Sequence, residues 1–115
     1  MLDIYGIKNC NTVKKALDWL DAHNIAYTFH DYKKEGVDEK KLKAWVKELG
    51  WETLLNRQGT TWRKLPDDIK EGINHSKALQ LMIENPSIIK RPLIDNGKQR
   101  IVGMDETVYE RYFAE

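Results

Sequence analysis

The stretch that decides the fold is residues 2–20, LDIYGIKNCNTVKKALDWL. It begins with a short, mostly apolar segment that ends at Gly6, which is typical of a strand. After Cys10, apolar residues recur at the three- and four-residue spacing of one helix face: Val13, Ala16, Leu17 and Leu20. We therefore predict a strand, a turn and a helix, with the polar side chains of residues 9–12 capping the helix.

The next segment extends this start into a βαβ unit. The helix is expected to end near residues 23–24, and residues 25–30, IAYTFH, alternate in polarity as a second strand does. Two strands joined by one helix are expected to be parallel, with a right-handed crossover.

The middle of the chain is predicted to be helical. Asp38 caps a segment that Gly50 ends, with Leu42, Trp45, Val46 and Leu49 at helical spacing. A short turn over residues 51–55 and a polar loop over residues 56–64 follow. A short helix opens at Pro66. Residues 76–84 form a helix with Leu79, Met82 and Ile83 on one side, which residues 85–86, Asn-Pro, end.

Strands return near the end of the chain. The pair Asn96-Gly97 lies between apolar residues 92–95 and 99–102, which predicts a hairpin. Asp105 then caps a helix whose apolar face holds Val108, Tyr109, Tyr112 and Phe113. The predicted class is α/β: a thioredoxin-like fold, βαβ plus ββα, with an all-helical insert. We expect one domain over residues 1–115, with residues 1–33 and 87–115 as the thioredoxin-like part and about 34–86 as the insert.

Composition excludes several classes of protein. The 115 residues carry 19 Lys and Arg against 18 Asp and Glu, a net charge of +1, which argues against a nucleic-acid binder driven by bulk charge. No apolar run is long enough to span a membrane, and the start lacks the pattern of a secretion signal. A single cysteine allows no internal disulfide. We therefore expect a cytoplasmic protein, and its small size and charged surface favour a monomer.

Cys10 lies where a strand ends and a helix begins. The N–H groups of a first helical turn favour a thiolate, and Lys8 and Lys14 are candidates to stabilise it further. The alternative is a small buried hydrophobic side chain. Val13 occupies the position that would complete a C-x-x-C pair, so a reactive Cys10 requires a thiol from another molecule, such as glutathione or a protein.

Two arginines are candidates for an anion site. Arg91 precedes Pro92 at the start of a predicted strand, which a thioredoxin-like layout places beside the cysteine. Arg57 lies in the polar loop, which suits an anion or plain solvent exposure, and Arg91 has the alternative of an ordinary surface ion pair. The three histidines have no metal-ligand spacing to one another or to Cys10, so we expect neither a metal site nor a bound cofactor.

Three stretches resemble the arsenate reductase-related ArsC/Spx family, and most of all its YffB-type branch. They are residues 4–12, IYGIKNCNT, residues 54–65, LLNRQGTTWRKL, and residues 85–93, NPSIIKRPL. The resemblance implies a thioredoxin-like domain with a helical insert and a catalytic cysteine at Cys10. It also implies oxyanion-binding arginines at Arg91 and in the pair Asn56-Arg57, where we choose Arg57. Among the anion-binding candidates we also count Asn11, Thr12 and Pro92.

The resemblance leaves three hypotheses. Arsenate reductases of this type have a His where this chain has Gly6 and an Arg where it has Gly103, which favours a glutathione-dependent thiol/disulfide reductase. Its Cys10 would form a mixed disulfide that external glutathione resolves, with glutaredoxin as a further partner. The second hypothesis is an arsenate reductase coupled to glutathione and glutaredoxin. The third is an Spx-like regulator that binds the RNA polymerase alpha subunit, although Val13 removes the C-x-x-C switch common in that branch.

Overall fold

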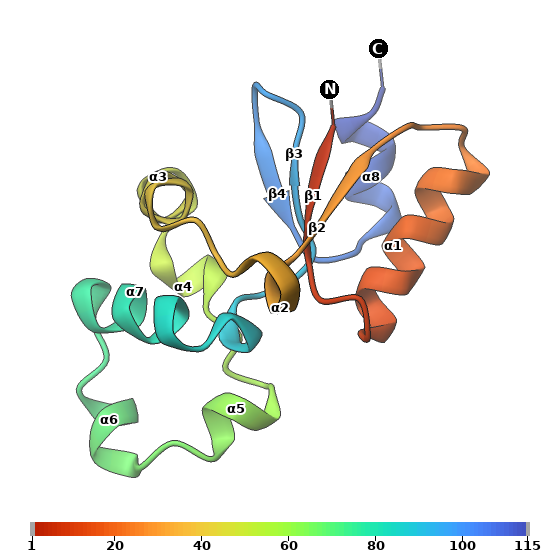
Figure 1. The fold of residues 1–115 in the computed structure, drawn as a ribbon. Coiled ribbons are helices and arrows are strands. Elements are labelled where there is room, and N and C mark those ends of the chain that lie inside the picture. Colours follow the sequence, from red (N-terminus) through yellow and green to blue (C-terminus); the bar gives the residue numbers. More distant parts are fainter. Residues whose placement is uncertain (1, 115) are drawn as a thin grey trace. The chain divides into compact units, whose positions relative to one another are not determined.

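The computed structural model describes residues 2–114, which divide into two units (Figure 1). Unit 1 combines the chain up to Asp31 with the chain from Arg91 onward, and unit 2 is Tyr32–Lys90. We expected the insert to span about residues 34–86. The observed junctions lie slightly outside this range, because a helix begins directly at Tyr32 and backbone hydrogen bonds hold residues 88 and 90 to unit 2.

Within the described residues, unit 1 contains a four-stranded sheet of order β2-β1-β3-β4. The strands are β1 (Asp3–Gly6), β2 (Thr28–Asp31), β3 (Leu93–Asp95) and β4 (Arg100–Val102). β1 and β2 are parallel, whereas β1–β3 and β3–β4 are antiparallel, so the predicted parallel pair and hairpin are both confirmed. β2 begins three residues later than predicted. The Ile25 N–H instead donates to the Leu20 carbonyl at 3.0 Å and ends the preceding helix.

Helices α1 (Asn11–Ala22) and α8 (Glu106–Tyr112) lie together on one face of this sheet (Figure 1). Opposite pairs in the sheet register align Phe29, Ile4, Ile94 and Ile101 across the four strands. These residues and both helices form one hydrophobic core, whose buried members are Leu2, Ile4, Ala16, Leu20, Ile94 and Tyr109. The expectation that Val108 belongs to this core is wrong. Its side chain is 43% exposed, because the buried face of α8 is centred on Tyr109.

Unit 2 is helical, with α2 (Tyr32–Glu35), α3 (Glu39–Leu49), α4 (Trp51–Leu54), α5 (Thr60–Arg63), α6 (Asp67–Glu71), α7 (His75–Glu84) and the 3-10 turn η1 (Pro86–Ile88). Its core is built mainly from α3, α4, α7 and η1, with Leu42, Trp45, Val46, Leu54, Ala78, Met82 and Ile88 buried. The predicted cap is confirmed, since Asp38 accepts from the Lys41 N–H, and Gly50, at φ +89°, ends α3. α7 begins at His75 and buries Ala78 rather than Leu79 and Ile83, which are only half-buried.

Two short parts of unit 2 were not predicted as helices. α2 follows β2 directly, and α5 lies inside the predicted polar loop. Each has only four residues, too few to show a helical repeat of apolar positions.

An isolated antiparallel bridge joins Leu55 to Ile89. The Asn56 N–H donates to the Ile88 carbonyl at 2.8 Å, and the Lys90 N–H donates to the Leu54 carbonyl at 2.6 Å. This bridge holds the end of α4 beside the end of unit 2. Over residues 2–114, no helix is long and apolar enough to cross a membrane.

Candidate functional site

Cys10 is the N-cap residue of α1, with an extended backbone at φ −142° and ψ 125°. Its carbonyl accepts the first helical hydrogen bond, from the Lys14 N–H at 2.9 Å. The expectation that polar side chains of residues 9–12 cap the helix is wrong, because in the described structure no side-chain capping hydrogen bond is made at the start of α1. Asn11 and Thr12 are exposed in the first turn, and the cysteine side chain occupies the capping position.

The surroundings of Cys10 favour its thiolate. Partial burial opposes ionisation and by itself raises the pKa of the thiol. The Val13 N–H, a hydrogen bond from Arg91, the Arg91 positive charge and the Thr12 N–H act in the opposite direction. Together they outweigh burial, and the pKa of Cys10 lies below its ordinary value. Two backbone donors of a helix start and one guanidinium therefore favour the thiolate form of Cys10.

Arg91 reaches Cys10 from the segment just before β3. It is half-buried, and the next residue, Pro92, is buried and follows a cis peptide bond. A Cβ atom added to Gly6 would lie 3.7 Å from the Arg91 Cβ and 3.1 Å from the Val13 Cγ2. The missing side chain at Gly6 thus leaves room for Arg91 beside the first turn of α1. The Pro92 carbonyl, in turn, accepts from the Gly103 N–H at 2.9 Å and ties this corner to the end of β4.

The two lysines proposed as thiolate stabilisers have a different position. Lys8 and Lys14 are exposed, and within the described chain neither is among the groups that lower the pKa of Cys10. Asn11 is not among them either. The cation that acts on the sulfur is Arg91, which lies about 80 residues farther along the chain, just before β3.

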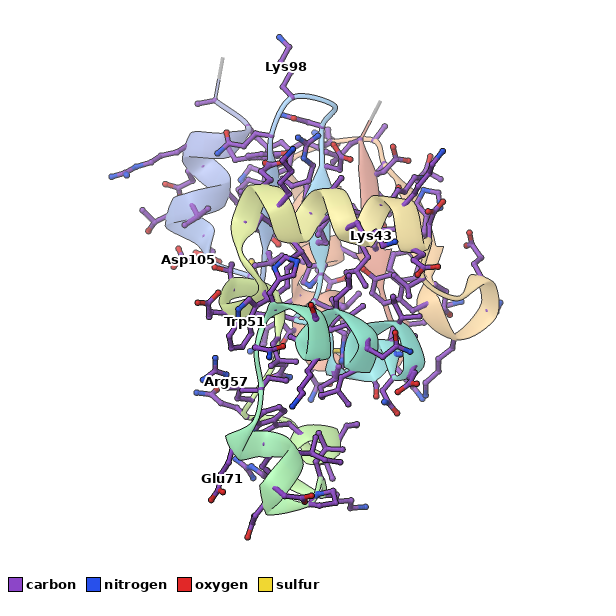
Figure 2. All side chains as sticks on the ribbon, turned by 90° about the vertical axis from the view of Figure 1, so that its left-hand side faces the viewer. Lys43, Trp51, Arg57, Glu71, Lys98 and Asp105 are labelled. Carbon is purple, nitrogen blue, oxygen red and sulfur yellow. The ribbon has the colours of Figure 1, made fainter. Side chains whose placement is uncertain are left out.

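Arg57 belongs to unit 2, in the loop that follows α4. The Gln58 N–H donates to the Asn56 side-chain oxygen at 3.1 Å, which closes a tight turn around Arg57. The Arg57 guanidinium carbon lies 5.0 Å from the centre of the Trp51 ring (Figure 2). This distance is that of a cation–π contact.

A cavity of about 380 Å³ adjoins this loop, lined by Glu52, Thr53, Leu55, Asn56, Arg57, Gln58 and Lys90. Our sequence analysis missed Trp51 and Lys90. The signal for Lys90 was the pair of adjacent cations, Lys90-Arg91, before Pro92. No pattern in the sequence pointed to Trp51, because its contact with Arg57 depends on the conformation of the loop. In the described chain, no cluster of three or more His, Cys, Asp or Glu residues is arranged to hold a metal ion.

The chain is similar to known proteins over almost its whole length. A sequence model of the ArsC family matches residues 5–112. A solved structure named YffB superimposes with a TM-score of 0.94 at 46% identity, covering 99% of this chain and all of the other. An arsenate reductase (ArsC)-related protein from Brucella melitensis matches with a TM-score of 0.80 at 49% identity, covering 99% of this chain and 95% of the other. Together these matches confirm the thioredoxin-like fold with its helical insert.

A more distant relative has another role. The global transcriptional regulator Spx of Streptococcus agalactiae is 27% identical over 92% of this chain and 78% of its own length. The matches thus include both arsenate reductase-related proteins and transcriptional regulators.

Proposed function

The chain belongs to the ArsC family, and from this premise we propose that it is a glutathione-dependent thiol/disulfide reductase with Cys10 as its nucleophile. The arsenate reductase-related members of the family support an oxidoreductase at the coarse level. The observation that carries the finer proposal is the lowered pKa of Cys10, which Arg91 and the first turn of α1 produce. A thiolate is the form of cysteine that attacks a disulfide.

The proposed reaction has two steps. The Cys10 thiolate attacks the glutathionyl sulfur of a mixed disulfide, forms a Cys10–glutathione disulfide and releases the other thiolate, which takes a proton from water. The thiolate of a second glutathione then attacks the glutathionyl sulfur, releases the Cys10 thiolate and leaves as oxidised glutathione. The net change is a thiol–disulfide exchange, in which the mixed disulfide and one glutathione thiol become oxidised glutathione and the free thiol of the substrate. No second cysteine of this chain takes part, because Cys10 is the only one.

Arg91 has two roles in this scheme. It stabilises the Cys10 thiolate before this thiolate attacks in the first step. It also stabilises the same thiolate when Cys10 is the leaving group of the second step. Thr12 contributes its backbone N–H, and Pro92 lies between Arg91 and the first residue of β3, Leu93. Arg57 is proposed as a binding residue for the anionic groups of glutathione, with glutaredoxin as an external reductant.

Arsenate reduction is the second candidate, which the Brucella melitensis relative favours by its name. Two positions in this chain disfavour it. Gly6 has little space for the His of arsenate reductases, since a Cβ would lie 3.1 Å from the Val13 Cγ2. Gly103 has φ +87°, a conformation that the Arg of arsenate reductases would adopt only with strain. The Spx-like alternative has the 27% identical relative in its favour.

Intact mass spectrometry after incubation with oxidised glutathione tests the proposal. We expect one glutathionyl group on the wild type and none on Cys10→Ser, and its removal by reduced glutathione. An unmodified wild type, or equal modification of the serine variant, would refute the thiol reductase. Coupled oxidation of NADPH through glutathione reductase, with arsenate in place of the disulfide, separates the second candidate. A pull-down with the C-terminal domain of the RNA polymerase alpha subunit separates the third.

A further inference from the structure

We propose that Lys90 and Arg57 form a carboxylate-binding subsite in unit 2, which selects an acidic thiol compound such as glutathione over a neutral one. This inference rests on the proposed function, because it names the feature of the substrate that the protein recognises. Both residues line the cavity of about 380 Å³ beside the loop after α4. A cavity of this volume is within the range of small-molecule sites.

The backbone brings Lys90 to this loop. The bridge between Leu55 and Ile89, with the hydrogen bond from the Lys90 N–H to the Leu54 carbonyl, fixes the position of Lys90 beside the residues that lead into the loop. Two residues far apart in the sequence, Arg57 and Lys90, therefore share one cavity because of a specific backbone pairing.

The loop itself is held in one conformation. The Asn56 side chain accepts from the Gln58 N–H, and its amide nitrogen lies 2.9 Å from where a Cβ of residue 59 would be. A side chain at position 59 would therefore require the Asn56 amide to shift. Arg57 projects from this turn against the ring of Trp51 (Figure 2). A guanidinium already held by a ring loses less conformational freedom when it binds an anion.

The two cations of the cavity form no ion pair in the described part of the chain, and Arg57 is held by the Trp51 ring instead. Other lysines do form ion pairs: exposed Lys43 with Glu39 at 3.8 Å, and half-buried Lys70 with Asp67 at 3.9 Å. The cavity lining combines these two cations with side-chain amides at Asn56 and Gln58 and with a single carboxylate, that of Glu52, so positive charge is in excess. Such donors suit the oxygens of a carboxylate. Glutathione carries two carboxylates, whereas a hydroxyethyl thiol carries none.

The experiment compares two disulfides that react with Cys10, oxidised glutathione and the neutral hydroxyethyl disulfide. The readout is the ratio of their second-order rate constants, so that effects on Cys10 itself cancel. Since both cations are exposed and screened by solvent, we expect Lys90→Gln to lower the ratio roughly two- to fivefold. Lys64→Gln, which removes an exposed lysine of unit 2 outside the cavity, should leave the ratio unchanged. An unchanged ratio for Lys90→Gln, or an equal loss for Lys64→Gln, refutes the subsite.

A binding measurement keeps the subsite testable if Cys10 does not react. S-methylglutathione, which has the carboxylates but no free thiol, is titrated into the 15N-labelled protein. We expect shifts of the backbone amides around Arg57, and a dissociation constant roughly two- to fivefold larger in Lys90→Gln than in Lys64→Gln. Shifts elsewhere only, or equal constants in the two variants, overturn the subsite. A failure of glutathionylation in the mass measurement, by contrast, overturns the proposed function.

Discussion

Replacing Arg91 by glutamine should raise the pKa of Cys10. Glutamine keeps a hydrogen-bond donor and removes the charge that, together with the helix N–H groups, holds the pKa down. Two unit charges about 4 Å apart interact by about 1 kcal/mol in water and about 4 kcal/mol near a protein surface. Since Cys10 is partly exposed, we take the lower figure, which corresponds to about 0.7 pKa unit.

The effect on reactivity has opposite signs at the two ends of the pH range. Below the pKa of Cys10, the thiolate fraction of Arg91→Gln falls about fivefold, and its intrinsic nucleophilicity rises about twofold, with a Brønsted coefficient of about 0.4–0.5. The net rate should therefore fall roughly two- to threefold. Above the pKa values of both proteins, only the second effect remains, and the variant should react about twice as fast.

Exchange with hydroxyethyl disulfide, followed against pH, measures both limits because this disulfide has no charge for Arg91 to bind. Lys8→Gln is the matched control. It removes a cation two residues from Cys10 that does not lower the pKa of the thiol, and its profile should coincide with that of the wild type. If Arg91→Gln has the wild-type profile, or if Lys8→Gln shifts equally, the electrostatic account of Cys10 is wrong.

Three further predictions concern stability. Because the pKa of Cys10 is lowered in the folded state, the wild type should become more stable relative to Cys10→Ser as pH rises from below that folded pKa to the unfolded value near 8.5, measured by urea unfolding. Gly6→Ala should lower the free energy of unfolding by about 1–2 kcal/mol, since the new methyl would lie 3.1 Å from Val13; an unchanged urea midpoint would contradict this close approach. Tyr109→Phe should cost about 1–2 kcal/mol in thermal unfolding, because its buried hydroxyl donates to the Gly103 carbonyl at 2.6 Å; a loss below 0.5 kcal/mol, roughly, would mean that water replaces this bond.

The fold could be predicted where local pattern and burial agree. Val13, Ala16 and Leu20 recur at helical spacing, and all three are buried. The hairpin signal at Asn96-Gly97 is equally local, and Gly97 has the positive φ, +90°, that such turns require. Val108 was misassigned because apolar residues at positions 108, 109, 112 and 113 fit one helix face, whereas α8 buries Tyr109 and leaves Val108 exposed.

The site could be predicted only in part. Cys10 was identifiable because it lies at a boundary between two local patterns. Arg91 required the pairing of β3 with β1, in which Tyr5 lies opposite Leu93, a long-range contact that follows from the proposed layout rather than from any local pattern. Lys90 could not be assigned, because one isolated bridge decides where it lies. Spacing along the chain does not specify such a pairing.

The division of the chain also determines how unit 1 can fold. Its central strand pair, β1 with β3, joins parts of the chain that are separated by all of unit 2. Closing an unstructured loop of roughly 60 residues would cost about 3.6 kcal/mol of chain entropy beyond a constant. Unit 2 brings its own ends together, since α2 at its start contacts η1 near its end. Once unit 2 has folded, its own contacts have already brought its two ends together. The pairing of β3 with β1 then loses little more chain entropy than if a short connection joined the two strands.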